Sequence, residues 1–132
     1  MKILKILLVV SVFTLFFSQC RYSFIVPEDV PVIDPEDPNA PQISFADEIE
    51  PIFNNNNNCT SCHNTGGQVP DLSTGNAFKA INTSRYLNSG NPEESLIYKY
   101  PHPDTSTHTR KKYSAAQAAL ILGWIQQGAK NN

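Results

Sequence analysis

Two cysteines and a histidine stand within five residues of this chain, in the segment Cys59-Thr-Ser-Cys62-His63. Thiols three positions apart can reach the two vinyl groups of one porphyrin and form thioethers. The residue that follows the second thiol can then supply an imidazole to the iron. The motif therefore predicts one covalently bound haem c, with His63 as the proximal iron ligand.

Three other chemistries also use a Cys-x-x-Cys pair. A Cys59–Cys62 disulfide suits an exported protein but leaves His63 without a role. A zinc site needs two further ligands, and His102 and His108 stand six residues apart, without the compact spacing of a ligand pair. A thioredoxin-type redox pair needs a strand–helix–strand context, for which the sequence gives no signal. Haem attachment uses all three residues, and a structural protein with a zinc ion or a disulfide is the alternative.

The N-terminus has the pattern of an export signal. A short basic start precedes a mostly apolar segment of twelve residues, Ile6–Phe17, shorter than the roughly 20 residues that span a bilayer. This predicts a signal peptide over residues 1–19. Cys20 follows, and the segment is similar to a lipobox in which Gln19 replaces the usual small residue. We therefore expect acyl chains on Cys20 and a lipoprotein anchored in a bacterial membrane, facing the periplasm or the cell surface.

Charge and motif content exclude several functions. The formal net charge is −2, and loss of Lys2 and Lys5 with the signal peptide leaves 8 basic against 12 acidic residues, a net charge of −4. Nucleic acid is therefore not an expected partner, and the basic run at 110–112 is interpreted as a solvated turn. No catalytic triad, phosphate-binding loop or defined carboxylate pair is recognisable, so we do not expect an enzyme.

Composition divides the exported chain into two parts. Five prolines and five acidic residues alternate between residues 21 and 41. Proline favours extended backbone without internal hydrogen bonds, and like charges repel one another. Residues 20–41 are therefore predicted to form a semi-rigid tether, and residues 42–132 to form the folded domain.

Helical signals and no strand signals follow in the folded domain, which predicts an all-α fold. Three or four short helices are expected, near residues 44–53, 74–81, 91–100 and 114–128. The last is the clearest, because Ser114 and Gln117 have the spacing of a capping box. A domain with so many loop residues has a thin core, and such domains usually need a metal, a cofactor or a disulfide.

The residues from about Phe45 to Ala129 resemble the cytochrome c-like domain, class I-like with a single Cys-x-x-Cys-His motif, of bacterial lipoproteins. The matching stretches are IEPIFNNNNNCTSCHN, PDLS, NPEESLIYK and YSAAQAALILGWIQQGA. The resemblance implies a small helical domain around one covalent haem and a role in electron transfer to a redox protein that the sequence does not identify. It also implies that the Pro70 carbonyl accepts the proximal imidazole N–H and that Trp124 lies near the haem edge.

The sixth iron ligand departs from this family's pattern. Such domains commonly use a methionine before the last helix, but the only methionine here is Met1, in the signal peptide. His108, six residues before Ser114, is the first choice, and His102 is the second. Two imidazoles predict an electron carrier with a lower potential than a His/Met cytochrome. A vacant sixth position predicts a five-coordinate domain for gas sensing or weak peroxidase activity.

Overall fold

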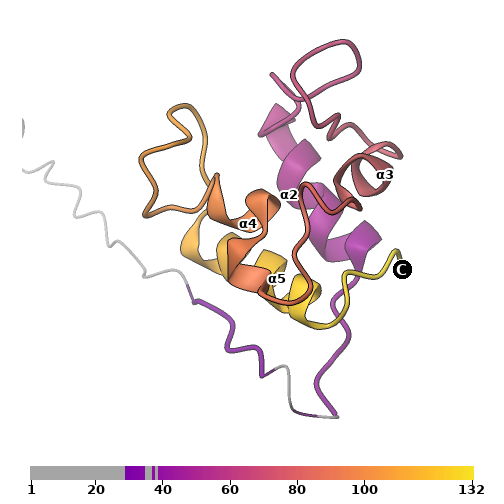
Figure 1. The fold of residues 1–132 in the computed structure, drawn as a ribbon, viewed down its shortest axis with the longest axis vertical. Helices are drawn as coiled ribbons and strands as arrows, with labels where there is room; N and C mark the ends of the chain where they lie inside the picture. The colour runs from indigo at the N-terminus through magenta and orange to yellow at the C-terminus, as the bar shows by residue number, and fades with distance from the viewer. Residues whose placement is uncertain (1–28, 35–36, 38) are drawn as a thin grey trace, which may run out of the picture.

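The computed structural model describes residues 29–34, 37 and 39–132, so the predicted signal peptide and Cys20 lie outside the described residues. The described residues form helices and no strand, which confirms the all-α prediction (Figure 1). None of these helices has the length and apolar character needed to cross a membrane. The elements in chain order are η1 (Phe45–Ile49), α2 (Glu50–Asn54), η2 (Asn55–Asn57), α3 (Ala77–Ile81), η3 (Pro92–Glu94), α4 (Leu96–Lys99) and α5 (Ala115–Gln126).

The first predicted helix is present but begins with a wide turn. Ser44 caps it, because its side chain accepts a hydrogen bond from the Asp47 amide, and its own amide donates to the Glu48 carboxylate at 2.7 Å. The Ile49 amide then donates to the Ser44 carbonyl, five residues back, as in a π-helix. Pro51 follows at the start of α2. Since proline cannot donate and its ring crowds the carbonyl four residues back, the wide turn lets the helix continue through it.

The middle helices are shorter than the sequence predicts. The helix expected near residues 74–81 begins only at Ala77, since Gly75 lies before it in the left-handed region, with φ 80°. The helix expected at 91–100 is divided into η3 and α4, because Ser95 between them is extended, with ψ 127°. Most of the chain from Cys59 to Tyr113 is therefore irregular, and its position depends on contacts with the flanking helices.

Helix α5 begins and ends with the capping motifs that its sequence predicts. Ser114 and Gln117 form the complete capping box. At the other end Gly128 has φ 96°, its amide donates to the Ile125 carbonyl, and the Ala129 amide donates to the Trp124 carbonyl. These two bonds form a Schellman motif and satisfy carbonyl groups that the end of the helix leaves unpaired.

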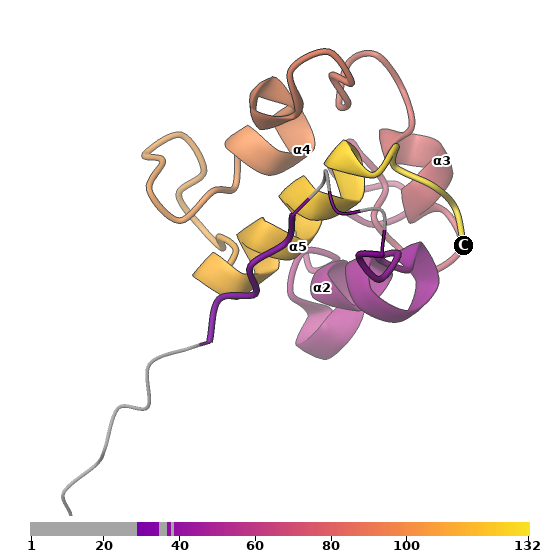
Figure 2. The same cartoon turned by 90° about the horizontal axis from the view of Figure 1, so that it is seen from below.

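The core lies where α5 meets η1 and α2, with the shorter helices around them (Figures 1 and 2). The Phe45 and Trp124 rings pack at 5.3 Å between centroids, and Phe78 packs edge-on against Phe45 at 5.2 Å. The end of the chain closes this layer, since the Ala46 amide donates to the Asn132 carbonyl at 3.0 Å. The buried apolar residues are Ile43, Phe45, Ile49, Ile52, Phe53, Leu72, Ala77, Ile81, Ile97, Tyr113, Ala118, Ile121, Trp124 and Ile125.

One residue of the predicted tether packs on the domain. The segment 29–34 runs along α5 (Figure 2), and Ile33 is partly buried against the core. A Cβ atom built on Gly123 would lie 2.7 Å from Cδ1 of Ile33 and 2.9 Å from Cδ1 of Ile43. Glycine at this position therefore lets the segment approach the helix, so the packed domain includes at least Ile33 as well as residues 42–132.

Gly123→Ala is expected to detach this segment while changing the free energy of unfolding by less than about 2 kcal/mol. The added methyl group displaces Ile33, while alanine gains about 1 kcal/mol over glycine in a helix interior. Cleavage at Asp29 and Asp34 by a protease specific for acidic residues should become faster. Ile33→Ala, which removes the side chain that packs on the helix and adds no methyl group, should also be cleaved faster, and unchanged cleavage in Gly123→Ala contradicts the prediction.

Candidate functional site

The two cysteines and the histidine lie on one tight turn directly after η2. The Cys59 amide donates to the Phe53 carbonyl at 2.9 Å, which joins the motif to the end of α2. The Cys59 carbonyl in turn accepts from the amides of Cys62 and His63, at 3.1 and 2.9 Å. Asn56, with φ 54°, lets the chain reverse before the motif, a conformation that asparagine tolerates better than most residues. The run of five asparagines at 54–58 thus supplies the last residue of α2 and the tight turn η2.

The loop after the motif folds back onto it. The Gln68 amide donates to the Cys62 carbonyl at 2.8 Å, and the Leu72 amide donates to the His63 carbonyl at 2.9 Å. Gly67 lies so close that a Cβ atom there would be 2.5 Å from the Cys62 carbonyl oxygen. The close return of the loop therefore requires glycine at position 67.

Gly67→Ala is expected to destabilise the fold by about 1–3 kcal/mol, because the new methyl group meets a backbone oxygen that cannot move without opening the motif turn. Gly90→Ala is the matched control, since its Cβ would come no closer than 3.6 Å to the Asn88 side chain. Thermal unfolding of both variants measures the difference. Equal midpoints would show that the motif turn can accommodate the methyl group.

His63 has a hydrogen-bond acceptor behind its ring. Its Nδ1 lies 3.2 Å from the carbonyl oxygen of Pro70. A donor–acceptor contact here fixes the orientation of the ring and leaves Nε2 as the nitrogen available to a metal. The family resemblance implies this contact for the proximal imidazole, and the structure brings the two residues together.

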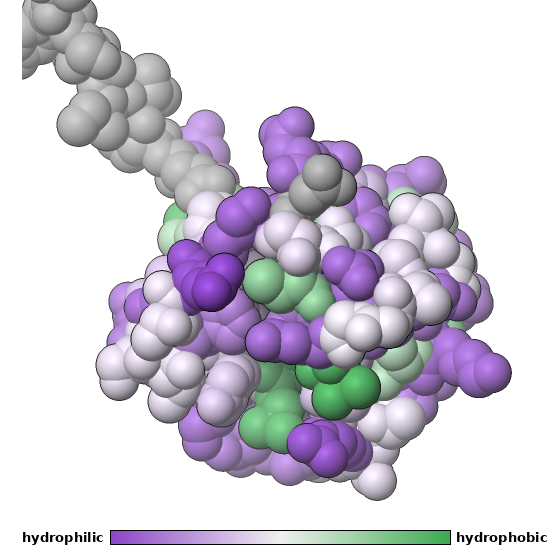
Figure 3. All heavy atoms as spheres, turned by 90° about the horizontal axis from the view of Figure 1, so that it is seen from above, coloured by the Kyte–Doolittle hydropathy of each residue, from purple (hydrophilic) through white to green (hydrophobic). Residues whose placement is uncertain are grey.

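A cavity of about 630 Å³ lies beside the motif, within the range of roughly 300–1,000 Å³ typical of ligand pockets. Three of its apolar side chains, Val69, Leu96 and Tyr100, are 75, 40 and 50 % exposed. Figure 3 shows hydrophobic residues exposed together on one face, with polar residues around them. Exposed apolar groups gathered around a hollow indicate a ligand site. The lining also includes Cys59, Cys62, His63, Pro70, Leu72, Arg85, Tyr86, His108 and Tyr113.

His108 lines the same cavity, opposite His63. The centroids of the two imidazole rings are 6.3 Å apart and their planes differ by 24°. Imidazole nitrogens bond metals at roughly 2 Å, so two rings on opposite sides of one iron have centroids roughly 6 Å apart. The Nδ1 atom of His108 is buried and has no hydrogen-bond partner among the described residues. The separation of the two rings matches that of two imidazoles bound to one metal.

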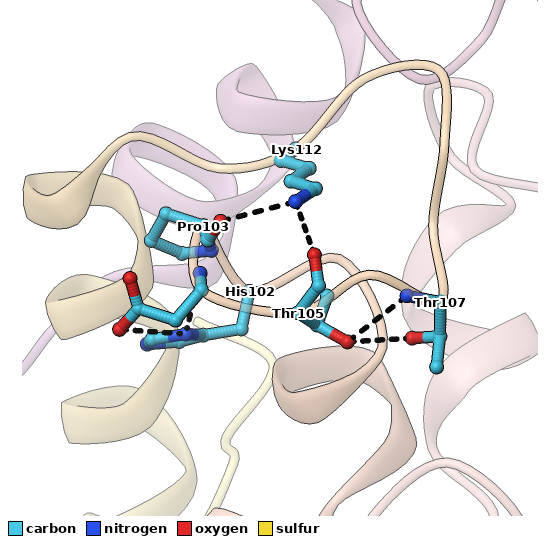
Figure 4. Close-up of polar contacts among 6 residues, drawn as sticks. His102, Pro103, Thr105, Thr107 and Lys112 are labelled. Carbon is cyan, nitrogen blue, oxygen red and sulfur yellow. Dashed lines mark hydrogen bonds and ion pairs between the residues drawn. The ribbon is translucent and has the colours of Figure 1, made fainter.

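His102 is turned away from this cavity and is not among its lining residues. Its ring packs against Tyr98 at 5.1 Å, and its Nδ1 accepts from the Asp104 amide and lies 3.7 Å from the Asp104 carboxylate. Figure 4 shows His102 at the start of the 102–112 loop, next to Pro103. The structure therefore favours the first choice of sixth ligand over the second.

Trp124, predicted near the haem edge, does not line the cavity. It is 1 % exposed, packs against Phe45, and donates its indole N–H to the Lys130 carbonyl at 2.9 Å. The Trp124 ring is therefore buried in the core between α5 and η1.

Tyr113, which sequence patterns did not indicate as a site residue, lines the cavity instead and donates its buried hydroxyl to the Ile97 carbonyl at 2.9 Å.

Positive charge surrounds the cavity. Arg85, Arg110, Lys111 and Lys112 line it, and no acidic side chain does so among the described residues. The basic run at 110–112 is exposed, as the prediction of a solvated turn requires, but it also lies at the mouth of the site. In a chain of net charge −2, this local excess of positive charge suits a ligand that carries carboxylates.

The two cysteines are free thiols in the structure. Burial raises the pKa of the Cys59 thiol to about 11, an effect that the charge of Lys111 partly opposes, so Cys59 is protonated at neutral pH. In the part of the chain that is described, no group of three or more histidine, cysteine or acidic side chains could hold a metal ion.

Comparison with known proteins finds no matching family model, no matching curated protein and no matching solved structure. The assignment of the site therefore depends on its own residues and their geometry.

Proposed function

We propose that this protein is a c-type cytochrome that carries electrons through one covalently bound haem with two histidine ligands. The observation that carries the proposal is the pair of facing imidazoles, 6.3 Å apart, across a cavity that both motif cysteines also line. Thioethers at Cys59 and Cys62 would hold the haem, and His63 and His108 would bind its iron from opposite sides. The cytochrome c-like fold itself belongs to this proposal, since only the all-α class is established.

Haem supplies reversible one-electron chemistry when it is bound. The chain's own residues would orient the two ligands and surround the cofactor. The Pro70 carbonyl holds the His63 ring in one orientation, and His108 occupies the opposite side of the cavity. Leu96 and Val69 offer apolar contact to part of a bound porphyrin, and Arg85 offers a counter-charge for the carboxylates of the cofactor.

The test is a pyridine haemochrome spectrum of the full chain, expressed in a bacterium together with a cytochrome c maturation system. The expected result is a c-type spectrum with one haem per chain and haem that stays attached through a denaturing gel. Haem that is absent, or that is lost on denaturation, would end the proposal.

The reduction potential should be lower than that of a His/Met cytochrome, because the second imidazole replaces the thioether ligand that raises the potential. A redox titration followed in the visible spectrum measures it. A clearly positive potential, typical of His/Met ligation, would contradict the bis-histidine assignment.

We also propose that the protein is exported and anchored to a membrane through acyl chains on Cys20, with a redox protein as its partner. The support is the apolar segment Ile6–Phe17 followed by Cys20 in the sequence. Metabolic labelling with a fatty acid tests the anchor, with Cys20→Ala as the unlabelled control. Equal labelling of the two chains would show that Cys20 is not the acylated residue.

A further inference from the structure

The two facing histidines differ in what holds them. Nδ1 of His63 has the Pro70 carbonyl as a partner at 3.2 Å. Nδ1 of His108 is buried and has no partner among the described residues. A metal-binding imidazole usually donates its other N–H to an acceptor, and a buried donor without one carries a desolvation cost. His108 is therefore the weaker of the two candidate ligands.

Contacts within its own loop keep His108 in place. The Tyr100 ring packs edge-on against it at 6.2 Å between centroids. The Thr107 hydroxyl donates to the Tyr100 carbonyl at 3.3 Å, which ties the residue before His108 to the end of α4. This loop lies on the surface, and Tyr100 is 50 % exposed. A ligand held by so few buried contacts can move away without opening the core.

Lys112 closes the loop on itself. Its Nζ donates to the Pro103 carbonyl at 3.1 Å and to the Thr105 carbonyl. The part of the loop after His108 is therefore joined to the part before it. Figure 4 shows the lysine between these two carbonyl oxygens. The Tyr113 amide adds a neighbouring bond to the Pro101 carbonyl at 2.9 Å. Lys112 is thus the side chain that bridges the two parts of the loop.

We propose that His108 is a releasable ligand, that Lys112 latches the loop carrying it, and that the vacated position binds a small neutral diatomic molecule. This rests on the proposed function. Opening of the loop would withdraw Nε2 of His108 from the iron of a bound haem, and the lone pair of the diatomic molecule would replace the lone pair of the imidazole as the sixth ligand. Both donors use a lone pair, so no electron or proton is transferred. Lys112 is a positioning residue, since it acts through the loop and not on the iron.

The test is the rate of carbon monoxide uptake by the reduced, haem-loaded full chain, with Lys112→Met as the variant. Uptake should be measurable in the natural protein and roughly three- to tenfold faster in the variant, because losing charge-assisted bonds favours the open loop by about that factor. Hydrogen exchange in a peptide covering residues 101–113 should rise in parallel. Lys112→Arg, which keeps donors for both carbonyls, should restore the slow rate.

Lys79→Met is the control, since Lys79 is an exposed lysine on α3 that does not line the cavity. Its uptake rate should equal that of the natural protein. Equal acceleration by both variants would assign the effect to charge alone and overturn the latch. Covalent low-spin haem that takes up no carbon monoxide would overturn the releasable ligand, while the proposed function would stand. A chain without covalent haem would overturn the proposed function itself.

Discussion

Replacing Cys59 and Cys62 together by alanine is expected to abolish covalent haem attachment. In the proposed cytochrome each thiol would supply one thioether, and without both sulfur atoms no covalent bond to the haem could form. Haem staining of a denaturing gel and the intact mass of the chain measure the loss. The effect is all-or-none, whereas the remaining His63 and His108 could still bind haem reversibly in the 630 Å³ cavity.

The control for this experiment is Cys20→Ala, which removes a thiol outside the motif. It should retain one haem per chain, although its membrane attachment should change. Single Cys59→Ala and Cys62→Ala variants should each keep at most one thioether and stain more weakly. Full haem staining of the double variant would show that the cysteines serve another chemistry, and the proposed cytochrome would be withdrawn.

His108→Ala is expected to convert a low-spin haem into a high-spin haem. Two imidazoles give the iron two strong axial ligands, and loss of one leaves a weak ligand or an open position. His108 lines the cavity opposite His63, with ring centroids 6.3 Å apart, and the loop offers no other imidazole on that side. Visible and electron paramagnetic resonance spectra of the oxidised protein measure the spin state.

His102→Ala is the matched control, because His102 belongs to the same loop but packs against Tyr98 and contacts Asp104. Its spectrum should remain low-spin. High-spin haem in the His102 variant, with low-spin haem in the His108 variant, would reverse the ligand assignment. High-spin haem in the natural protein would favour the five-coordinate alternative, in which gas binding or peroxidase activity replaces electron transfer.

Features that depend on neighbouring residues could be predicted from the sequence. The caps at Ser44 and Ser114 each form through contacts within four residues, and both are present. The Cys59–His63 motif is equally local, since one turn of backbone sets the spacing of its three side chains. The lengths of the middle helices were predicted less well, because Gly75 and Ser95 end helical geometry at positions that periodicity alone does not mark.

Features that depend on distant residues needed the tertiary structure. Trp124 has an aromatic side chain that could contact a cofactor, yet packing against Phe45, some 80 positions away, places it in the core. The basic run at 110–112 has the pattern of a solvated turn, yet the return of its loop places it around the cavity. Sequence patterns record periodicity and spacing, and neither shows which long-range surfaces meet.

The sequence by itself therefore determined the helical class, the positions of the caps and the chemistry expected of two thiols and an adjacent imidazole. Only the tertiary structure decided which distant histidine faces that imidazole. His102 and His108 are both polar loop residues, and no local interaction distinguishes them. The fold of the 102–112 loop does so, because Lys112 and Thr107 fix its path and bring His108, and not His102, into the cavity.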